Sequence, residues 1–321
     1  MKNVSPQPLR AHYPLQTQDQ PTLVLQVQYP QQDIPASTAA VCDVVYVHGS
    51  TFGADMSIFY RFDGRSWADA LNEAGHTVWG FDWAGYGHSQ RYPHDGTEPV
   101  GRMHDVLPQL QRVVAAIHAR NGNRPVVLLG HSWGATVATA YASLHPDDVS
   151  ALALFGPIVA RAASLLPSAA AVPPARHYAT TLWAQYRRFV EDVPRGQAQV
   201  LSEQHFEDWG RAYLATDPDA NSRQPPAVLT PGGPMADIRA WWSDQWLFEP
   251  AHVVAPTLLV RGAWDSLCTD ADAAVLLGAL GSTHTVDRTV ECATHLMHLE
   301  GQRDQLYQHV NQFLSTVEFS T

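Results

Sequence analysis

The stretch Gly130-His131-Ser132-Trp133-Gly134 follows the apolar run 126–129 and precedes residues 135–144, whose composition predicts a helix. A serine between two glycines at a strand-to-helix turn lies on a tight backbone that small flanking residues permit. The first turn of the helix offers free N–H groups and the positive end of its dipole beside the hydroxyl. The stretch therefore predicts a nucleophilic serine, Ser132, at the end of a buried strand.

Apolar runs that predict strands alternate with segments that predict helices along most of the chain. The strands are expected at 41–47, 77–81, 126–129, 151–155, 257–260 and 284–291, and the helices at 65–74, 106–119, 135–144, 271–280 and 299–317. An earlier run at 22–29 alternates like an antiparallel strand. This order predicts an α/β fold with a mostly parallel central sheet and helices on both faces.

The alternation breaks between residues 157 and 255. Helical stretches are expected at 176–192, 196–215 and 234–248, with loops at 162–174 and 222–234. Five of the ten tryptophans lie in this segment: Trp183, Trp209, Trp241, Trp242 and Trp246. We expect most of these rings to pack a helical lid onto the core and one or two to touch substrate in an apolar pocket. The predicted domains are a core of residues 1–157 and 251–321 and an inserted helical cap of residues 158–250.

Composition and charge narrow the classes of partner. The chain has 321 residues, 45% hydrophobic and 16% charged, with a net charge of −11 and a pI near 5.7. This balance disfavours nucleic acid and anionic surfaces as partners. The first ten residues lack the apolar region of a signal peptide, and no run approaches the roughly 18 apolar residues of a membrane span. We therefore expect neither nucleic acid nor a membrane as a partner, and composition alone indicates no substrate.

Cysteine and histidine usage predicts neither a disulfide framework nor a metal site. The three cysteines, Cys42, Cys268 and Cys292, lack paired spacing and fit a reducing, cytoplasmic location. The sixteen histidines form no H-E-x-x-H motif and no clustered Cys/His spacing. No metal or cofactor is expected.

A serine nucleophile needs a base, and the base needs an acid that orients it. Asp265 is the predicted acid because it follows the strand at 257–260 by a short turn that contains Gly262. Asp270 is the rival, but Thr269-Asp270 is typical of a helix start. The strand that ends at Phe155 is followed by no carboxylate, which favours Asp265.

His295 is the predicted base. It lies between the last strand and the last helix, where a loop side chain can reach the serine. The order Ser132, Asp265, His295 along the chain is the order of a known nucleophile–acid–base arrangement. His298 is the competitor, three residues further on, and we expect it to start the final helix and line the wall below.

Stabilising an oxyanion requires two N–H donors aimed at one point. One predicted donor is the backbone N–H of Trp133, the residue after the nucleophile. The second is expected from the glycine-containing loop 48–53, which follows the strand at 41–47. Within that loop the N–H of Ser50 is preferred, with Thr51 as the alternative.

Together these residues resemble the α/β-hydrolase superfamily. The resemblance rests on His48-Gly49, on the D-x-x-G-x-G-x-S pattern at 82–89, on the glycine-flanked serine, and on Trp264-Asp265 and Thr294-His295. It covers about residues 20–157 and 250–318. It implies an acyl-enzyme mechanism in which Ser132 attacks, His295 transfers protons and Asp265 holds the imidazolium, without a cofactor.

The residue at the nucleophile position separates this chain from some relatives. Haloalkane dehalogenases and epoxide hydrolases attack through an aspartate, whose ester is hydrolysed at its own carbonyl, whereas a serine ether would be a dead end. Proline iminopeptidases resemble the chain in Ser-Trp-Gly and in lid size, but His131 departs from their pattern.

We therefore predict a serine hydrolase that cleaves a small or medium, mainly apolar carboxylic ester or lactone. The alternatives are a proline-iminopeptidase-like aminopeptidase or amidase, for which lid acids would bind the free amino group, and a non-catalytic ligand-binding protein of the same fold. The candidate lid acids are Glu191, Asp192, Glu203, Glu207, Asp208 and Asp244.

Overall fold

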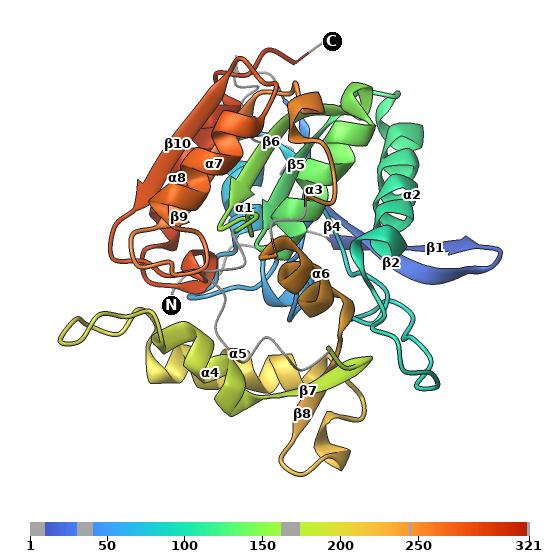
Figure 1. The fold of residues 1–321 in the computed structure, drawn as a ribbon, viewed down its shortest axis with the longest axis vertical. Helices are drawn as coiled ribbons and strands as arrows, with labels where there is room; N and C mark the ends of the chain where they lie inside the picture. Colours follow the sequence, from blue (N-terminus) through green and yellow to red (C-terminus); the bar gives the residue numbers. More distant parts are fainter. Residues whose placement is uncertain (1–9, 31–40, 162–173, 244–245, 320–321) are drawn as a thin grey trace, which may run out of the picture.

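The computed structural model describes residues 10–30, 41–161, 174–243 and 246–319. Its centre is an eight-stranded sheet in the order β1-β2-β4-β3-β5-β6-β9-β10 (Figure 1). The strands are β1 (Arg10–Thr17), β2 (Gln20–Gln28), β3 (Asp43–Val47), β4 (Thr77–Phe81), β5 (Val126–His131), β6 (Val149–Phe155), β9 (Thr257–Gly262) and β10 (Thr285–Val290). The predicted α/β fold with a mostly parallel sheet is confirmed.

The antiparallel part of the sheet is confined to one edge. Strand β2 pairs antiparallel with both β1 and β4, while β4, β3, β5, β6, β9 and β10 run parallel. The expected strand at 22–29 is β2, and its partner β1 was not anticipated. Because six strands run parallel, their carboxyl ends meet at a single edge of the sheet, where ligands of open α/β sheets bind.

Helices cover both faces because successive strand residues point to opposite sides. Val45 and Leu128 pack with helices α2 (Met103–Asn121), α3 (Trp133–Leu144) and α7 (Asp270–Ala279) on one face. Val44 and Val127 pack with α1 (Trp67–Glu73) and α8 (Arg303–Leu314) on the other. The strands in the middle are buried on both faces, which explains their continuous apolar runs.

The inserted segment differs from its expected form. It contains helices α4 (Leu182–Val190), α5 (Glu203–Ala215) and α6 (Gly233–Trp241), and a two-stranded antiparallel sheet of β7 (His177–Thr181) and β8 (Ala227–Pro231). The expected helix at 176–192 is wrong over residues 176–181, where β7 lies, and α4 begins only at Leu182. The expected loop at 222–234 is also wrong, since it holds β8 and the start of α6. Of the expected loop at 162–174, residues 162–173 lie outside the described part of the chain.

The inserted segment lies across the end of the sheet that carries the strand carboxyl ends, with α6 next to the core and α4, α5, β7 and β8 beyond it (Figure 1). Trp209 on α5 is fully buried against Phe52 of the core, and its indole N–H donates to the Met56 carbonyl oxygen at 3.0 Å. Trp241 is also buried, whereas Trp183 and Trp246 are 67% and 36% exposed. Trp242 is partly buried against the core, so three of the five rings pack inward, in line with the expectation that most would. The division of the chain into a core of residues 1–157 and 251–321 and a cap of residues 158–250 stays a prediction.

Within the described ranges, no helix combines the length and the apolar character that a membrane crossing requires.

Candidate active site

Ser132 lies at the sharp turn between β5 and α3. Its backbone has φ 55° and ψ −128°, a conformation that a residue other than glycine adopts only under strain. The flanking glycines permit the turn. A methyl group on Gly130 would lie 2.5 Å from the Ala135 Cα, and one on Gly134 would lie 2.2 Å from the His48 carbonyl oxygen. The turn therefore brings α3 directly onto the end of β3 and holds the serine above the sheet.

The structure brings together the three side chains that the sequence singled out. His295 Nε2 is 2.8 Å from Ser132 Oγ, and His295 Nδ1 is 2.9 Å from Asp265 Oδ2. Asp265 follows β9 and His295 follows β10, so both come from loops at the carboxyl edge of the sheet. A carboxylate accepts the Nδ1 proton, which leaves Nε2 as an acceptor for the serine hydroxyl.

The Asp265 carboxylate is held by its own loop. Its Oδ1 accepts the backbone N–H groups of Leu267 at 2.8 Å and Cys268 at 3.1 Å, while Oδ2 faces the imidazole. The side chain is fully buried. The rival Asp270 begins α7, where its side chain is 90% exposed and pairs with Arg261 at 2.7 Å. The structure thus places Asp265, and not Asp270, against the histidine.

His298 was expected to start the final helix, and this is wrong. It lies in the short 3-10 turn Met297–Leu299 before that helix. Its ring packs against His131 and Phe155, at centroid distances of 4.5 and 5.1 Å. Neither ring nitrogen has a hydrogen-bond partner among the described residues. Burial lowers the pKa of His298 to about 3, so the ring is a neutral packing group.

His131 contacts the loop that carries His295, a role that sequence reasoning missed. Its Nε2 lies 3.1 Å from the His295 carbonyl oxygen, and because that oxygen only accepts, Nε2 donates. The ring stacks on Phe155 with its centroid 4.5 Å away. Burial holds the pKa of His131 well below its usual range, so the ring stays neutral. A neutral donor anchors the histidine backbone without adding charge beside the base.

A second anchor of this loop is Glu300, which is fully buried. The backbone N–H of Thr294 donates to Glu300 Oε2 at 2.9 Å, and the Thr294 hydroxyl donates to Oε1. Burial raises the pKa of Glu300 to about 7 despite these two donors. The residue before His295 is therefore tied to a carboxyl group that titrates near neutral pH.

Gly156 leaves room for the histidine and the acid. It follows β6 with φ +54°, and a methyl group there would lie 2.9 Å from His295 Nδ1 and 3.1 Å from Asp265 Oδ2. From the sequence, Gly156-Pro157 suggested only the end of a strand. The glycine after β6 was the available signal, because a missing side chain at a strand end permits a close approach.

The predicted oxyanion donors flank Ser132. Trp133 begins α3, so its N–H lies in the first helical turn, where no intrahelical acceptor exists. A methyl group on Gly49 would lie 3.3 Å from the Ser132 Cβ, which shows how closely the 49–52 loop approaches the serine. Ser50 and Thr51 both line the cavity beside it. The choice of Ser50 over Thr51 therefore stays a prediction.

Residues of the D-x-x-G-x-G-x-S pattern at 82–89 hold the end of the loop that carries Ser50. The buried Asp82 carboxylate accepts the N–H of Ala54 at 2.8 Å and of His88 at 3.0 Å. Methyl groups on Gly53 and Gly87 would lie 2.0 and 2.1 Å from its oxygens. The motif therefore stabilises the loop that carries Ser50 through these hydrogen bonds and close contacts.

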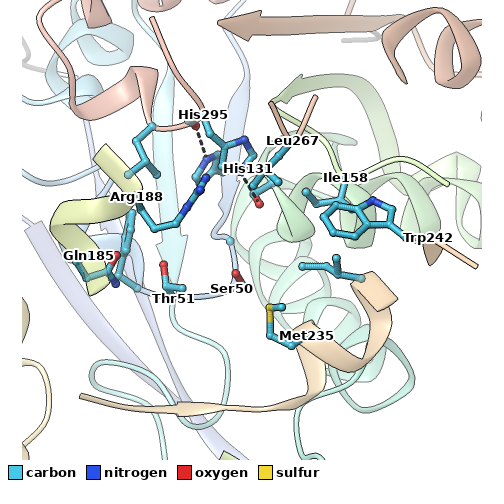
Figure 2. A pocket seen from close by; sticks show the side chains of 15 residues that line it. Ser50, Thr51, His131, Ile158, Gln185, Arg188, Met235, Trp242, Leu267 and His295 are labelled. Carbon is cyan, nitrogen blue, oxygen red and sulfur yellow. Dashed lines mark hydrogen bonds between the residues drawn. The ribbon is translucent and has the colours of Figure 1, made fainter. Parts of the chain in front are cut away.

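A cavity of about 250 Å³ opens over Ser132 and His295 (Figure 2). Apolar side chains form one wall, from α6, from the loop after β6 and from the loop after β9. They are Ile158, Met235, Ile238, Trp242 and Leu267. Gln185 and Arg188 of α4 lie on the opposite side, beyond Thr51 (Figure 2). No group of three or more His, Cys, Asp or Glu side chains able to hold a metal ion is present in the described part of the chain.

A family model described as alpha/beta hydrolase fold matches residues 44–302, so the chain belongs to the α/β-hydrolase family. No curated protein matches the sequence. Among solved structures, the thioesterase domain from the curacin biosynthetic pathway is 16% identical with a TM-score of 0.61, covering 94% of this chain and 99% of that one. Epoxide hydrolase A from Mycobacterium thermoresistibile is 17% identical with a TM-score of 0.61, and the match covers 97% of this chain and 100% of that one.

An esterase from Thermogutta terrifontis is also similar, at 16% identity and a TM-score of 0.55, covering 95% of this chain and 98% of that one. At these identities the likeness concerns the fold. The neighbours include proteins named as thioesterase, epoxide hydrolase and esterase, so the fold alone does not select a reaction.

We predict that Gly156→Ala slows the reaction of Ser132 with a fluorophosphonate at least about tenfold, because displacing a reacting group by a fraction of an ångström misaligns it. Gly64→Ala is the matched control. Gly64 also has a left-handed φ, of +86°, but a methyl group there would meet no atom of the described chain within 4 Å. Equal labelling rates in the two variants would contradict the role assigned to Gly156.

We also predict a pH-dependent stability difference between the wild type and Glu300→Gln. A carboxyl whose pKa is raised to about 7 by burial stabilises the fold fully below its unfolded pKa of about 4.5 and loses that contribution as pH rises through 7. The wild type should lose about 3 kcal/mol relative to the variant between these pH values. Urea unfolding of both proteins from pH 4.5 to 8 measures the difference, and parallel curves would refute the prediction.

Proposed function

We propose that this α/β-hydrolase is a serine hydrolase that cleaves a small or medium, mainly apolar carboxylic ester or lactone. The observation that carries the proposal is the continuous hydrogen-bonded series Ser132 Oγ, His295 imidazole and Asp265 carboxylate. The cavity over Ser132 has a large apolar wall, which suits a hydrocarbon arm of the substrate.

In the proposed mechanism, Ser132 Oγ attacks the acyl carbon while His295 Nε2 takes its proton. The Asp265 carboxylate stabilises the resulting imidazolium. The N–H groups of Trp133 and Ser50 donate to the tetrahedral oxyanion. The imidazolium then protonates the leaving alcohol, and water activated by His295 releases the acid from the acyl-enzyme. No metal or cofactor has a part in this sequence of steps.

An attack on an alkyl carbon fits the nucleophile less well. Opening an epoxide through serine would form an ether, which no neighbouring group can hydrolyse. An acyl carbon gives an ester intermediate that the same histidine and oxyanion donors can resolve. The serine at position 132 therefore favours acyl transfer to water over the reaction named for the Mycobacterium neighbour.

The aminopeptidase alternative requires a carboxylate in the cavity to bind a free amino group. Among the described lining residues no acidic side chain is present, and Arg188 is a cation that would repel an ammonium group. Of the candidate lid acids, Asp244 lies outside the described residues and Glu191 pairs with Arg188. The cavity therefore favours the ester hydrolase. The non-catalytic alternative predicts a folded protein whose serine is unreactive.

We expect Ser132→Ala to lower ester hydrolysis by several orders of magnitude while the protein stays folded, because the nucleophile is lost without a change in packing. The measurement is turnover of a panel of p-nitrophenyl esters, lactones and prolyl-naphthylamide, beside fluorophosphonate labelling. Ser143→Ala is the matched control, since Ser143 is a buried serine of α3 whose hydroxyl only donates to the Ala140 carbonyl. A panel in which only the amide is cleaved, or a folded wild type without labelling, would refute the proposal.

Asp265→Asn should reduce kcat by a large factor, about 10⁴ in a comparable triad, because an amide favours the wrong imidazole tautomer. The matched variant Asp270→Asn removes a charge at an exposed site and should retain wild-type kcat. If Asp270→Asn proved the more damaging change, the assignment of the acid would be wrong.

A further inference from the structure

The cavity over Ser132 has two chemically different sides. Figure 2 shows Met235, Ile158 and Trp242 on one side and Gln185 and Arg188 on the other, with His295 and Ser50 between them. A substrate whose reacting carbon lies at Ser132 therefore extends one arm toward hydrocarbon and another toward hydrogen-bond donors.

Gln185 and Arg188 reach the cavity from one face of α4, because residues three apart on a helix are neighbours. Arg188 Nη1 forms an ion pair with Glu191. Arg188 Nη2 is enclosed and makes no hydrogen bond to any described residue. The enclosed Gln185 Nε2 faces the Tyr213 hydroxyl, which serves as its hydrogen-bond partner. Arg188 Nη2 is thus the donor on this side of the cavity that lacks an acceptor among the described residues.

Enclosed donors without an acceptor are costly, and a charged one most of all. The surrounding acids do not fully compensate the guanidinium. Burial lowers the pKa of Arg188 even though Asp192 and Asp265 are close enough to act in the opposite direction. The ion pair with Glu191 involves the other nitrogen, at a side chain that is 32% exposed. Arg188 Nη2 itself therefore makes no hydrogen bond to an anion of the described chain, although Asp192 and Asp265 act on the guanidinium from a distance.

We propose that the Gln185–Arg188 side of the cavity binds a carboxylate of the substrate, so that the enzyme acts on esters with one hydrocarbon arm and one arm that ends in a carboxylate. This inference rests on the proposed function. A carboxylate can accept from the Arg188 guanidinium, and guanidinium–carboxylate hydrogen bonds are among the strongest in proteins. Gln185 adds a polar side chain to the same side of the cavity. The opposite wall of Ile158, Met235 and Trp242 takes the hydrocarbon arm.

The charge of the site favours a carboxylate over a phosphate. Arg188 is the one Arg or Lys side chain among the described residues that line the cavity. A single guanidinium matches a singly charged carboxylate, whereas a doubly charged phosphate would remain undercompensated beside Asp265 and Asp192.

The test compares substrates of equal shape within each variant. In the first series, the p-nitrophenyl monoesters of adipic and pimelic acid are each compared with the same ester whose free carboxyl is converted to a primary amide. In the second series, the charge lies on the other arm, and 4-carboxyphenyl butanoate is compared with 4-carbamoylphenyl butanoate. The readout is the ratio of kcat/KM for the charged ester to that for its amide, so a general loss of activity cancels.

For the wild type we expect a ratio of at least about ten in one of the two series, in keeping with a charge-assisted hydrogen bond. Arg188→Met should bring the ratio to one or below. Arg187→Met is the matched control, since Arg187 lies on the same helix with its side chain 63% exposed and also near Glu191. Its ratio should equal that of the wild type.

The outcomes separate the two proposals. Cleavage of neutral esters by the wild type with ratios near or below one in both series would overturn the carboxylate site and leave the esterase. A high ratio in the wild type that Arg188→Met leaves unchanged would also overturn the carboxylate site and leave the esterase function standing. A folded wild type that neither reacts with a fluorophosphonate nor cleaves any ester would overturn both.

Discussion

The close crossing of α3 over the end of β3 is the constraint on which the site depends. Gly134 lies so near the His48 carbonyl that no side chain fits between them, and Gly130 is similarly crowded by Ala135. Between the two glycines, Ser132 adopts a strained backbone conformation with φ 55° and ψ −128°. Such strain costs roughly 1–3 kcal/mol, and the buried packing of β5 and α3 on both sides sustains it. If α3 moved away from β3, the Ser132 hydroxyl would no longer be held above the sheet, and the N–H groups of the first turn of α3 would shift with it.

The acid and the histidine are held by different means. Asp265 is fixed locally, by the N–H groups of residues two and three positions further on. The histidine loop depends on distant contacts, with His131 of β5 bound to the His295 carbonyl and with Gly156 giving it space. Both distant residues border the serine turn or the strand beside it. The serine and the histidine are thus positioned by the same part of the sheet, which couples their alignment.

The sequence was sufficient for most of the core and for the residues that meet at its edge. Strands such as β5 and β9 are buried on both faces, so their apolar runs are unambiguous, and Ser132 and Asp265 follow these two strands. His295 follows β10, a mostly exposed edge strand, and was predicted from its place between the last strand and the last helix. β7 and β8 were missed because each is short and pairs only with the other, about fifty residues away, so no local period marks them. Arg188 was missed for a related reason, since a charged residue on an amphipathic helix usually faces water, and only the tertiary structure turns it toward the cavity.

The two sides of the cavity are attached to the core in different ways. Helix α6, which carries the apolar Met235 and Ile238, is tied to the serine turn through the buried Asp237, which accepts from the Met103 N–H at 2.6 Å and the Trp133 indole at 3.1 Å. Helix α4 reaches the core by way of α5. Phe189 packs against Trp209 of α5, and Trp209 packs on Phe52 and donates to the Met56 carbonyl oxygen at 3.0 Å. The apolar wall is thus bonded directly to the serine turn, whereas the Arg188 side of the cavity is held through a second helix.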